Sequence, residues 1–372
     1  MKKLFSLLLA ATMTFSLTLP ALADHYTYSE PEKSTMMPRS TPETHGMSSQ
    51  YILDLLDAFD YADAEVHNIL MAIDGEVVFE GHYAPYTALD PHIMFSGTKI
   101  FTNAAVGVAV TEGYLHLDDY VYDVLKDYVT QDVSELQSKV QLKHLLTMTS
   151  GVDRFMSGCR KGSELRPLTT SWIEHILTEP IVHEPGTYYL YSSGNTMLSS
   201  AMVTVATGKT CLELLNTTGF CEELGIKNFT WDMSPDGFNA GHGGIKITAE
   251  DLAKVGQLYM NGGVWNGKQI LSKEWCDLAI GYEKTVENQG DYAYHWTAYE
   301  DGLYYTATGS YGQTLAICPK LNMVIAIQAG TKQNIGELLY QNIFKPYGDA
   351  LDAGTVPEPD DALSAALAKR AE

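Results

Sequence analysis

Strand-like and helix-like segments are unevenly distributed along this chain, and this distribution limits the folds it can adopt. Near the start, Ile69–Ile73, an Asp74-Gly75 turn and Glu76–Phe79 have the pattern of a β-hairpin. Near the end, apolar stretches alternate with turns at 292–299, 303–308, 312–318 and 323–328. Helical patterns dominate between these two regions.

One antiparallel sheet built from both chain ends accounts for this order most economically. We therefore predict an α+β fold (an α/β sandwich), with helices flanking the sheet and an all-helical lobe of about 96–235 inserted in it. A helix capped by Ser48 and an amphipathic helix over 334–344 are expected to flank the sheet. The predicted domain spans 48–351, after an extended lead-in at 24–47 and before a loose polar tail at 352–372.

The first 23 residues have the pattern of a secretory signal. Met1-Lys2-Lys3 precedes an apolar run, and Ala21-Leu22-Ala23 forms a small-residue cleavage site. A membrane anchor is the alternative, but the run is short and contains three hydroxyl residues. We expect an exported protein, secreted or held in the periplasm or at the cell surface, with no membrane insertion after the signal is removed.

Charge and cysteine content exclude several functional classes. A net charge of −22 argues against nucleic acid and anionic membranes as partners, because both require a basic surface. The chain has no paired Cys-x-x-Cys, His-Glu-x-x-His or phosphate-loop motif, so no metal and no organic cofactor are expected. Five cysteines leave at least one thiol unpaired, and Cys211 and Cys221 are the expected disulfide by proximity. The sequence does not indicate an oligomeric state.

Ser96 and Lys99 open an apolar segment that ends at Gly113. On a helix, this spacing puts the hydroxyl and the amine on one face, so the amine can accept the hydroxyl proton. Ser96 would also lie in the first turn, where backbone N–H groups and the helix dipole favour negative charge. A helix-capping serine and a solvated lysine are the alternative, and about one such spacing is expected by chance in a chain of this size.

Two later motifs separate these alternatives. Ser96-Gly97-Thr98-Lys99, then Tyr191-Ser192-Ser193, then Ala307-Thr308-Gly309 resemble the three ordered motifs of the serine β-lactamase and penicillin-binding superfamily. The resemblance extends over about 38–345 and is greatest to the class C-related serine hydrolases, in the branch of 6-aminohexanoate-dimer hydrolases and esterases. It implies a β-lactamase/transpeptidase-like fold. Gly-x-Ser-x-Gly, the signature of another serine hydrolase fold, is absent.

The resemblance implies a role for each of these residues. Ser96 would be the nucleophile, and Lys99 with Tyr191 would act as general base and acid. A phenol held beside an ammonium ionises more easily, so we expect a lowered pKa for Tyr191. The backbone N–H groups of Ser96 and Ser310 would stabilise the oxyanion, although a glycine-rich bulge is the plainer explanation of the segment around Ser310.

Two departures from the β-lactamase motifs bear on the substrate. Ala307 replaces the lysine that would pair with a β-lactam carboxylate, and Ser193 replaces an asparagine, with Asn195 two residues later. A small ester or amide substrate is therefore expected; a sensor with little turnover and a D-amino-acid or cell-wall peptidase are the alternatives. The resemblance implies these substrate-binding residues: Ser193, Asn195, Thr308, Gly309, Tyr311 and Gln313. Tyr311 could equally be a core residue.

Overall fold

An antiparallel sheet is built from both ends of the chain, as the sequence predicts. The computed structural model describes residues 34–154, 170–281, 286–355 and 357–371. Within them the sheet has seven strands in the order β2-β1-β12-β11-β10-β9-β8. The strands are β1 (Val66–Ile73), β2 (Glu76–His82), β8 (Tyr292–Ala293), β9 (Trp296–Tyr299), β10 (Tyr304–Gly309), β11 (Gln313–Cys318) and β12 (Met323–Ala329). The first strand of the chain thus pairs with the last.

The predicted hairpin is present. Asp74 and Gly75 both have positive φ, as the tight turn of a two-residue hairpin requires, and Ile73 pairs with Glu76 across it. Short strands form two further sheets in the described residues, namely β3 (His92–Ile93), β4 (Thr230–Trp231), β5 (Ile245–Ile247), β6 (Val264–Trp265) and β7 (Lys268–Gln269).

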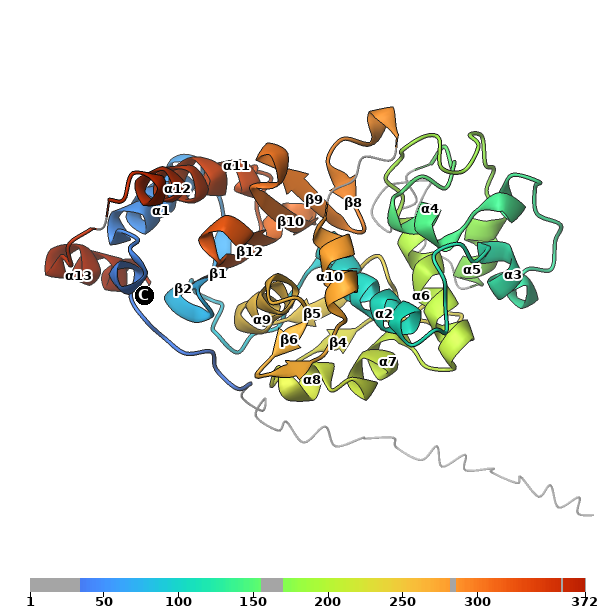
Figure 1. Cartoon of the computed structure of the whole chain (residues 1–372), viewed down its shortest axis with the longest axis horizontal. Coiled ribbons are helices and arrows are strands. Elements are labelled where there is room, and N and C mark those ends of the chain that lie inside the picture. Colours follow the sequence, from blue (N-terminus) through green and yellow to red (C-terminus); the bar gives the residue numbers. More distant parts are fainter. Residues whose placement is uncertain (1–33, 155–169, 282–285, 356, 372) are drawn as a thin grey trace, which may run out of the picture. The chain divides into compact units, whose positions relative to one another are not determined.

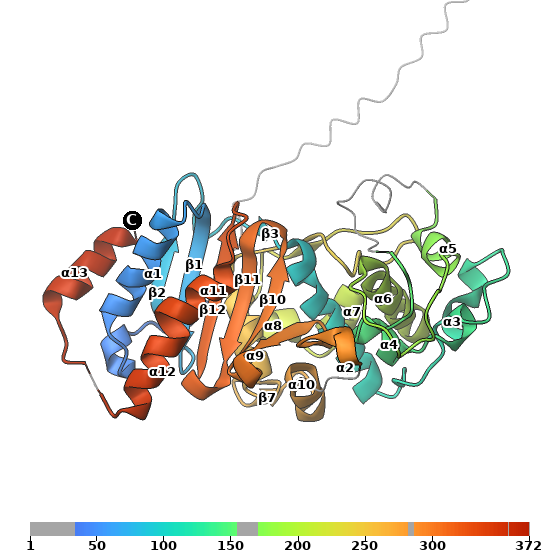
Figure 2. The same cartoon turned by 90° about the horizontal axis from the view of Figure 1, so that it is seen from above.

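Helices cover both faces of the large sheet (Figures 1 and 2). On one face lie α1 (Ser49–Tyr61), α11 (Ile335–Leu339) and α12 (Lys345–Asp352), and on the other lies α9 (Ala249–Met260). The strands alternate accordingly: Ile69 and Met71 belong to the core under α1, whereas Leu70 and Ala72 belong to the core that includes α9. The predicted flanking helices are therefore confirmed.

A helical lobe lies between the strand-rich parts of the chain. Its helices are α2 (Lys99–Thr111), α3 (Val121–Leu125), α4 (Leu142–Leu146), α5 (Trp172–Leu177), α6 (Ser193–Thr207), α7 (Cys211–Thr217) and α8 (Phe220–Glu223). Between this lobe and the sheet runs α2, which packs on α6 and α7 and is buried from Lys99 to Ala109 (Figure 2). The segment before α2 contacts β10 and β11, so the Ser96 region lies at the junction of lobe and sheet.

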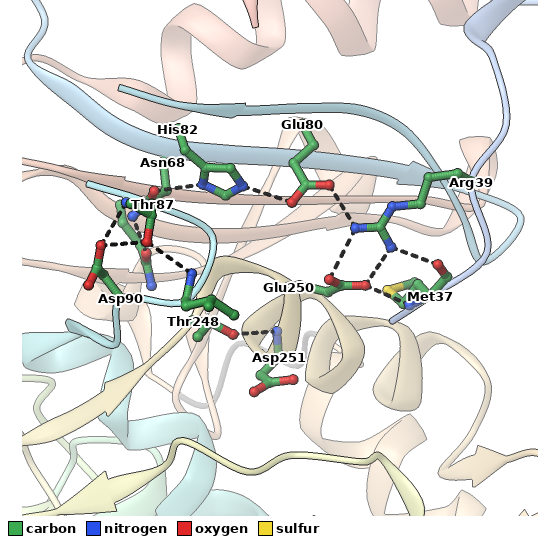
Figure 3. A network of polar contacts seen from close by, with 12 residues as sticks. Met37, Arg39, Asn68, Glu80, His82, Thr87, Asp90, Thr248, Glu250 and Asp251 are labelled. Atoms are coloured by element: carbon green, nitrogen blue, oxygen red, sulfur yellow. Dashed lines mark hydrogen bonds and ion pairs between the residues drawn. The ribbon is translucent and has the colours of Figure 1, made fainter. Parts of the chain in front are cut away.

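The lead-in is tied to the sheet through Arg39. Its backbone bridges Val77 on β2, and its guanidinium contacts Glu80 at 2.7 Å and Glu250, on α9, at 2.6 Å (Figure 3). These contacts hold an extended segment against two secondary-structure elements.

Among the residues that the structure describes, none of the helices combines the length and the apolar character needed to cross a bilayer.

The prediction of a loose tail after residue 352 is wrong. Asp360 caps α13 (Asp361–Arg370) by accepting hydrogen bonds from two backbone N–H groups. Leu367 is buried against the α1 side of the molecule, and Arg370 contacts Asp57 and Asp60 on α1. The sequence of this segment is largely polar, because only one buried leucine and one helix cap are needed to hold the helix in place.

The expected disulfide is also wrong. Cys211 and Cys221 are free thiols, and Cys211 is buried beside the Ser200 hydroxyl at 3.3 Å. Burial raises the pKa of the Cys211 thiol to about 12, which makes it inert. Both residues therefore serve as small apolar groups in the helical lobe. Cys159 lies outside the described residues.

Candidate active site

Ser96 lies in a single 3-10 turn, Phe95–Thr98, that leads directly into α2 (Lys99–Thr111). Phe95 has a φ of +45°, a conformation that costs a bulky non-glycine residue free energy and that is often found at functional sites. Met94 is fixed on both sides of its peptide, because its N–H donates to Ile245 and its carbonyl accepts from Gly97, each at 2.9 Å. The strained turn is thus held rigidly between the small sheet and α2.

Lys99 is buried at the start of α2, one turn from Ser96, and lines the same pocket. Its Nζ donates to the carbonyl oxygen of His242 at 3.2 Å. The same atom lies over the ring of Tyr191, 4.9 Å from its centroid. Lys99 therefore meets the face of the phenol, in a cation–π arrangement.

Tyr191 precedes α6 (Ser193–Thr207) directly and is hydrogen-bonded to the Ser96 hydroxyl. Burial raises the pKa of Tyr191 to about 12, and the hydrogen bond from Ser96 offsets only part of this effect. The expectation of a lowered pKa was wrong. The reason is burial, because the desolvated surroundings of Tyr191 disfavour a charged phenolate more than the neighbouring groups stabilise it. Tyr191 therefore carries its proton at neutral pH.

These side chains meet at a pocket of about 320 Å³. It is lined by residues from the Ser96 turn and the start of α2, from the segment before α6, and from the chain between β8 and the turn after β10, namely Ser96, Lys99, Tyr189, Tyr191, Tyr292, His295, Thr297, Thr308, Gly309 and Ser310. Lys99 is the one cationic side chain in this lining, and no carboxylate belongs to it, among the residues that the structure describes.

The edge of β10 forms one wall of the pocket. Pairing of β10 with β9 ends at Thr306, so the last residues of β10 have no strand beside them on that side within the described chain. Gly309 packs so closely against the turn that an added Cβ would overlap the carbonyl oxygen of Met94. Ser310 follows in a short turn and lines the same pocket as Tyr191. A glycine is therefore required where β10 meets the nucleophile turn.

The structure brings together Ser96, Lys99, Tyr191, Thr308, Gly309 and Ser310 of the residues singled out from the sequence. Four others lie outside the pocket lining. Asn195 is buried and accepts from the Ser150 hydroxyl at 2.8 Å, and Ser193 is buried in the first turn of α6. Gln313 donates to the Ala329 carbonyl at 2.6 Å and stabilises the turn after β10. These three buried residues belong to the framework around the pocket and not to its lining.

Tyr311, the fourth, is exposed and packs on Phe95, with ring centroids 5.5 Å apart. Its φ of +63° turns the chain outward after Ser310. It lines a neighbouring surface cleft together with Gln313 and Lys332. Tyr311 is 53% exposed, so it is not a core residue, which was the alternative that the sequence left open.

Four lining residues were not predicted: Tyr189, Tyr292, His295 and Thr297. His295 Nδ1 contacts the carbonyl oxygen of Lys99 at 3.0 Å, so in its neutral form the ring donates to the backbone of α2. Burial, and then the charge of Lys99, lowers the pKa of His295 to about 3. His295 is therefore neutral. The sequence signal was only an aromatic run, Tyr292 to Trp296, within a predicted strand.

Metal chemistry has no candidate site in the described part of the chain, where three or more histidine, cysteine, aspartate or glutamate side chains nowhere converge. The site consists instead of hydroxyl, phenol and ammonium groups around one pocket. This combination supports nucleophilic attack by a serine with proton transfer through a phenol.

Comparisons with known proteins agree with this geometry. Residues 67–345 match the Beta-lactamase family. The 6-aminohexanoate-dimer hydrolase of Paenarthrobacter ureafaciens is 25% identical over 274 residues, which are 67% of this chain and 69% of that protein.

Two solved structures show the same fold. A Bacillus anthracis protein provisionally named a 6-aminohexanoate-dimer hydrolase has a TM-score of 0.71 and 22% identity, over 88% of this chain and 90% of its own. The octameric penicillin-binding protein homologue of Pyrococcus abyssi has a TM-score of 0.63 and 20% identity, over 83% of this chain and 78% of its own. The predicted fold class is confirmed.

Proposed function

Because this chain belongs to the Beta-lactamase family and is a serine hydrolase, we propose that it cleaves a small ester or amide through an acyl-enzyme on Ser96. One observation carries the proposal: the Ser96 hydroxyl is hydrogen-bonded to Tyr191, whose ring lies under the Lys99 ammonium. A nucleophile, a proton acceptor and a stabilising charge are thus in contact before substrate binds.

In acylation, Ser96 Oγ attacks the carbonyl carbon while its proton passes to the Tyr191 oxygen. In the same step Tyr191 gives its own proton to the leaving nitrogen or oxygen, so its oxygen never carries two protons, and the scissile bond then breaks. The phenol is neutral before and after this relay, consistent with its pKa of about 12. The Lys99 charge, 4.9 Å from the ring centroid, stabilises the phenolate character that develops when the Tyr191 proton leaves ahead of the arrival of the Ser96 proton.

Deacylation uses the same groups in reverse. A water molecule takes the place of the leaving group, its proton passes to Tyr191, and the phenol proton returns to Ser96 Oγ as the acyl bond breaks. The carboxylic acid then leaves and the site is restored. The oxyanion of both steps would be stabilised by the backbone N–H groups of Ser96 and Ser310, two residues that line the pocket.

The substrate is proposed to have no carboxylate at the position where a β-lactam carboxylate would meet the lysine that Ala307 replaces. Ala307 is buried in the core and supplies no cation, and Lys99 is the one cation in the described lining. The relative from Paenarthrobacter is named for a dimer of an amino acid, and such a dimer contains an amide bond. This similarity supports a small amide as one substrate class, beside the simple esters that a serine nucleophile hydrolyses more easily.

We also propose that the enzyme is exported. The support is the pattern of the first 23 residues, which lie outside the described part of the chain. Expression in a bacterial host, followed by intact-mass measurement of the processed protein, tests this directly. A mature chain beginning at Asp24 is expected, and a full-length chain retained in the cytoplasm would contradict export.

Steady-state hydrolysis of p-nitrophenyl butyrate and of the 6-aminohexanoate dimer tests the proposed chemistry. Ser96→Ala should reduce kcat for both by roughly 10³-fold or more, because nucleophilic catalysis is lost. Ser364→Ala, which removes an exposed hydroxyl on α13, is the matched control and should behave as wild type. Hydrolysis by Ser96→Ala at the wild-type rate would refute the proposal.

A further inference from the structure

The phenol oxygen of Tyr292 is buried at the catalytic pocket and has no hydrogen-bond partner among the described residues. Only 8% of this residue is exposed. Buried hydroxyl groups nearly always find a partner, and leaving one unpaired costs about 1–3 kcal/mol. A tyrosine with no partner in the free enzyme is therefore expected to find one in the substrate.

The ring of Tyr292 is held firmly in this position. It meets Tyr191 edge to face, with centroids 5.7 Å apart, and Tyr189 at 5.8 Å. Its backbone pairs with Thr297 across the β8–β9 hairpin, and its carbonyl oxygen accepts a hydrogen bond from Gln289. The hydroxyl is therefore a preorganised donor, because the ring has little freedom to turn away.

Burial and the neighbouring Tyr191 and Tyr189 raise the pKa of Tyr292 well above its ordinary value. The hydroxyl thus stays protonated at neutral pH. A buried phenol that cannot ionise is suited to donate a hydrogen bond to a neutral acceptor, such as an ether or carbonyl oxygen.

The position beside Tyr191 indicates which half of the substrate Tyr292 meets. In the proposed mechanism Tyr191 delivers its proton to the leaving group, so the groups packed on Tyr191 face that half. Tyr292 contacts the rings of both Tyr191 and Tyr189, and all three residues line the pocket.

We propose that Tyr292 is a specificity residue that donates a hydrogen bond to an oxygen acceptor in the leaving group. The enzyme would then favour esters and amides whose leaving alcohol or amine carries an ether or carbonyl oxygen near the scissile bond. This inference rests on the proposed function, because it uses the direction of proton transfer through Tyr191. Tyr292 recognises the substrate and takes no proton in the reaction.

A pair of esters of equal size tests the inference. 2-Methoxyethyl butyrate and n-butyl butyrate share an acyl group and differ by one ether oxygen in the leaving alcohol. The ratio of their kcat/KM values is measured for wild type and for Tyr292→Phe. Comparing the two ratios cancels the intrinsic difference in reactivity between the esters, because that difference is the same for both enzymes. We expect the preference for the ether ester to fall by roughly 5- to 30-fold in the variant, as for the loss of one neutral hydrogen bond.

Tyr304→Phe is the matched control. Tyr304 is also buried, but it lies in the core under α1 and outside the pocket, so the ratio should equal that of wild type. Tyr292→Phe should unfold at a temperature no lower than wild type, because its hydroxyl has no partner to lose.

Two results would overturn the inference. An ester ratio that is the same in wild type and Tyr292→Phe would show that the hydroxyl does not meet the leaving group. A clear fall in unfolding temperature for Tyr292→Phe would show that the hydroxyl is paired within the protein. Failure of the proposed function gives a different result, namely hydrolysis of both esters by Ser96→Ala.

Discussion

Gly309 offers the sharpest structural test of the active site, because one methyl group there should misalign the two sides of the pocket. Gly309 is the last residue of β10 and packs on Met94. Met94 directly precedes the turn that carries Ser96. An added Cβ would overlap the Met94 carbonyl oxygen and would lie 3.1 Å from both the Met94 carbonyl carbon and Gln313 Cβ. Backbone atoms cannot move aside as the end of a flexible side chain can.

The expected effect follows from the displacement that the methyl requires. Ordinary Cβ contacts are 3.4–4 Å long, so β10 and the Ser96 turn must separate by about 1 Å. A misplacement of about 1 Å costs on the order of 10²-fold in rate, and loss of one oxyanion donor costs roughly 10²–10³-fold in kcat. We therefore expect Gly309→Ala to lower kcat by about 10²-fold or more, with a smaller change in KM, and to destabilise the protein by about 1–3 kcal/mol through overpacking.

The assay is hydrolysis of p-nitrophenyl butyrate, together with urea unfolding of the same preparations. Gly336→Ala is the matched control, since it adds the same methyl within α11, where the nearest neighbour is Asn334 Oδ1 at 3.5 Å. This control should retain wild-type kcat and gain roughly 0.5–1 kcal/mol of stability. A Gly309→Ala enzyme with kcat close to that of wild type would refute the close approach of β10 to the nucleophile turn.

Two further results are expected. Tyr191→Phe should lower kcat for the same ester by roughly 10²–10⁴-fold with little effect on KM, because the proton relay is lost; a variant within about tenfold of wild type would exclude Tyr191 from proton transfer. His295 has a pKa of about 3 when folded and 6.5 when unfolded, so unfolding takes up a proton below pH 6.5. Its contribution to stability is complete above pH 6.5 and is lost as the pH falls towards 3, by up to roughly 1.4 kcal/mol per pH unit. Urea unfolding across this range should show a shallower pH dependence for His295→Asn, and equal slopes would contradict the neutral histidine.

Much of the fold could be predicted because its determinants are local. The hairpin follows from alternating apolar residues around Asp74-Gly75, and the strand order from short turns such as the one between Cys318 and Met323. The last helix, α13, could not be predicted. Its stability comes from Leu367 and from ion pairs between Arg370 and α1, contacts that span most of the chain.

The site could be predicted in part. Ser96, Lys99, Tyr191 and Ser310 line one pocket because they belong to motifs with a fixed order along the chain. Tyr292 was missed because nothing in a strand of aromatic residues indicates which side chain faces a cleft between distant elements.

The electrostatics of Tyr191 also depend on tertiary structure. Sequence reasoning placed an ammonium beside the phenol, and Lys99 does lie over the ring and donates to the His242 carbonyl, but burial of Tyr191 outweighs this charge. Asn195 was expected to contact substrate, but its side chain bonds within the protein. Composition and spacing do not determine such orientations.

Intact-protein mass spectrometry of the enzyme quenched during turnover of p-nitrophenyl butyrate is the most direct test of the central claim, the Ser96 acyl-enzyme. We expect a single butyryl adduct, located on Ser96 by peptide mapping, that disappears as substrate is exhausted and is absent from Ser96→Ala. Turnover by wild type with an adduct on another residue, or with the same adduct in Ser96→Ala, would contradict it.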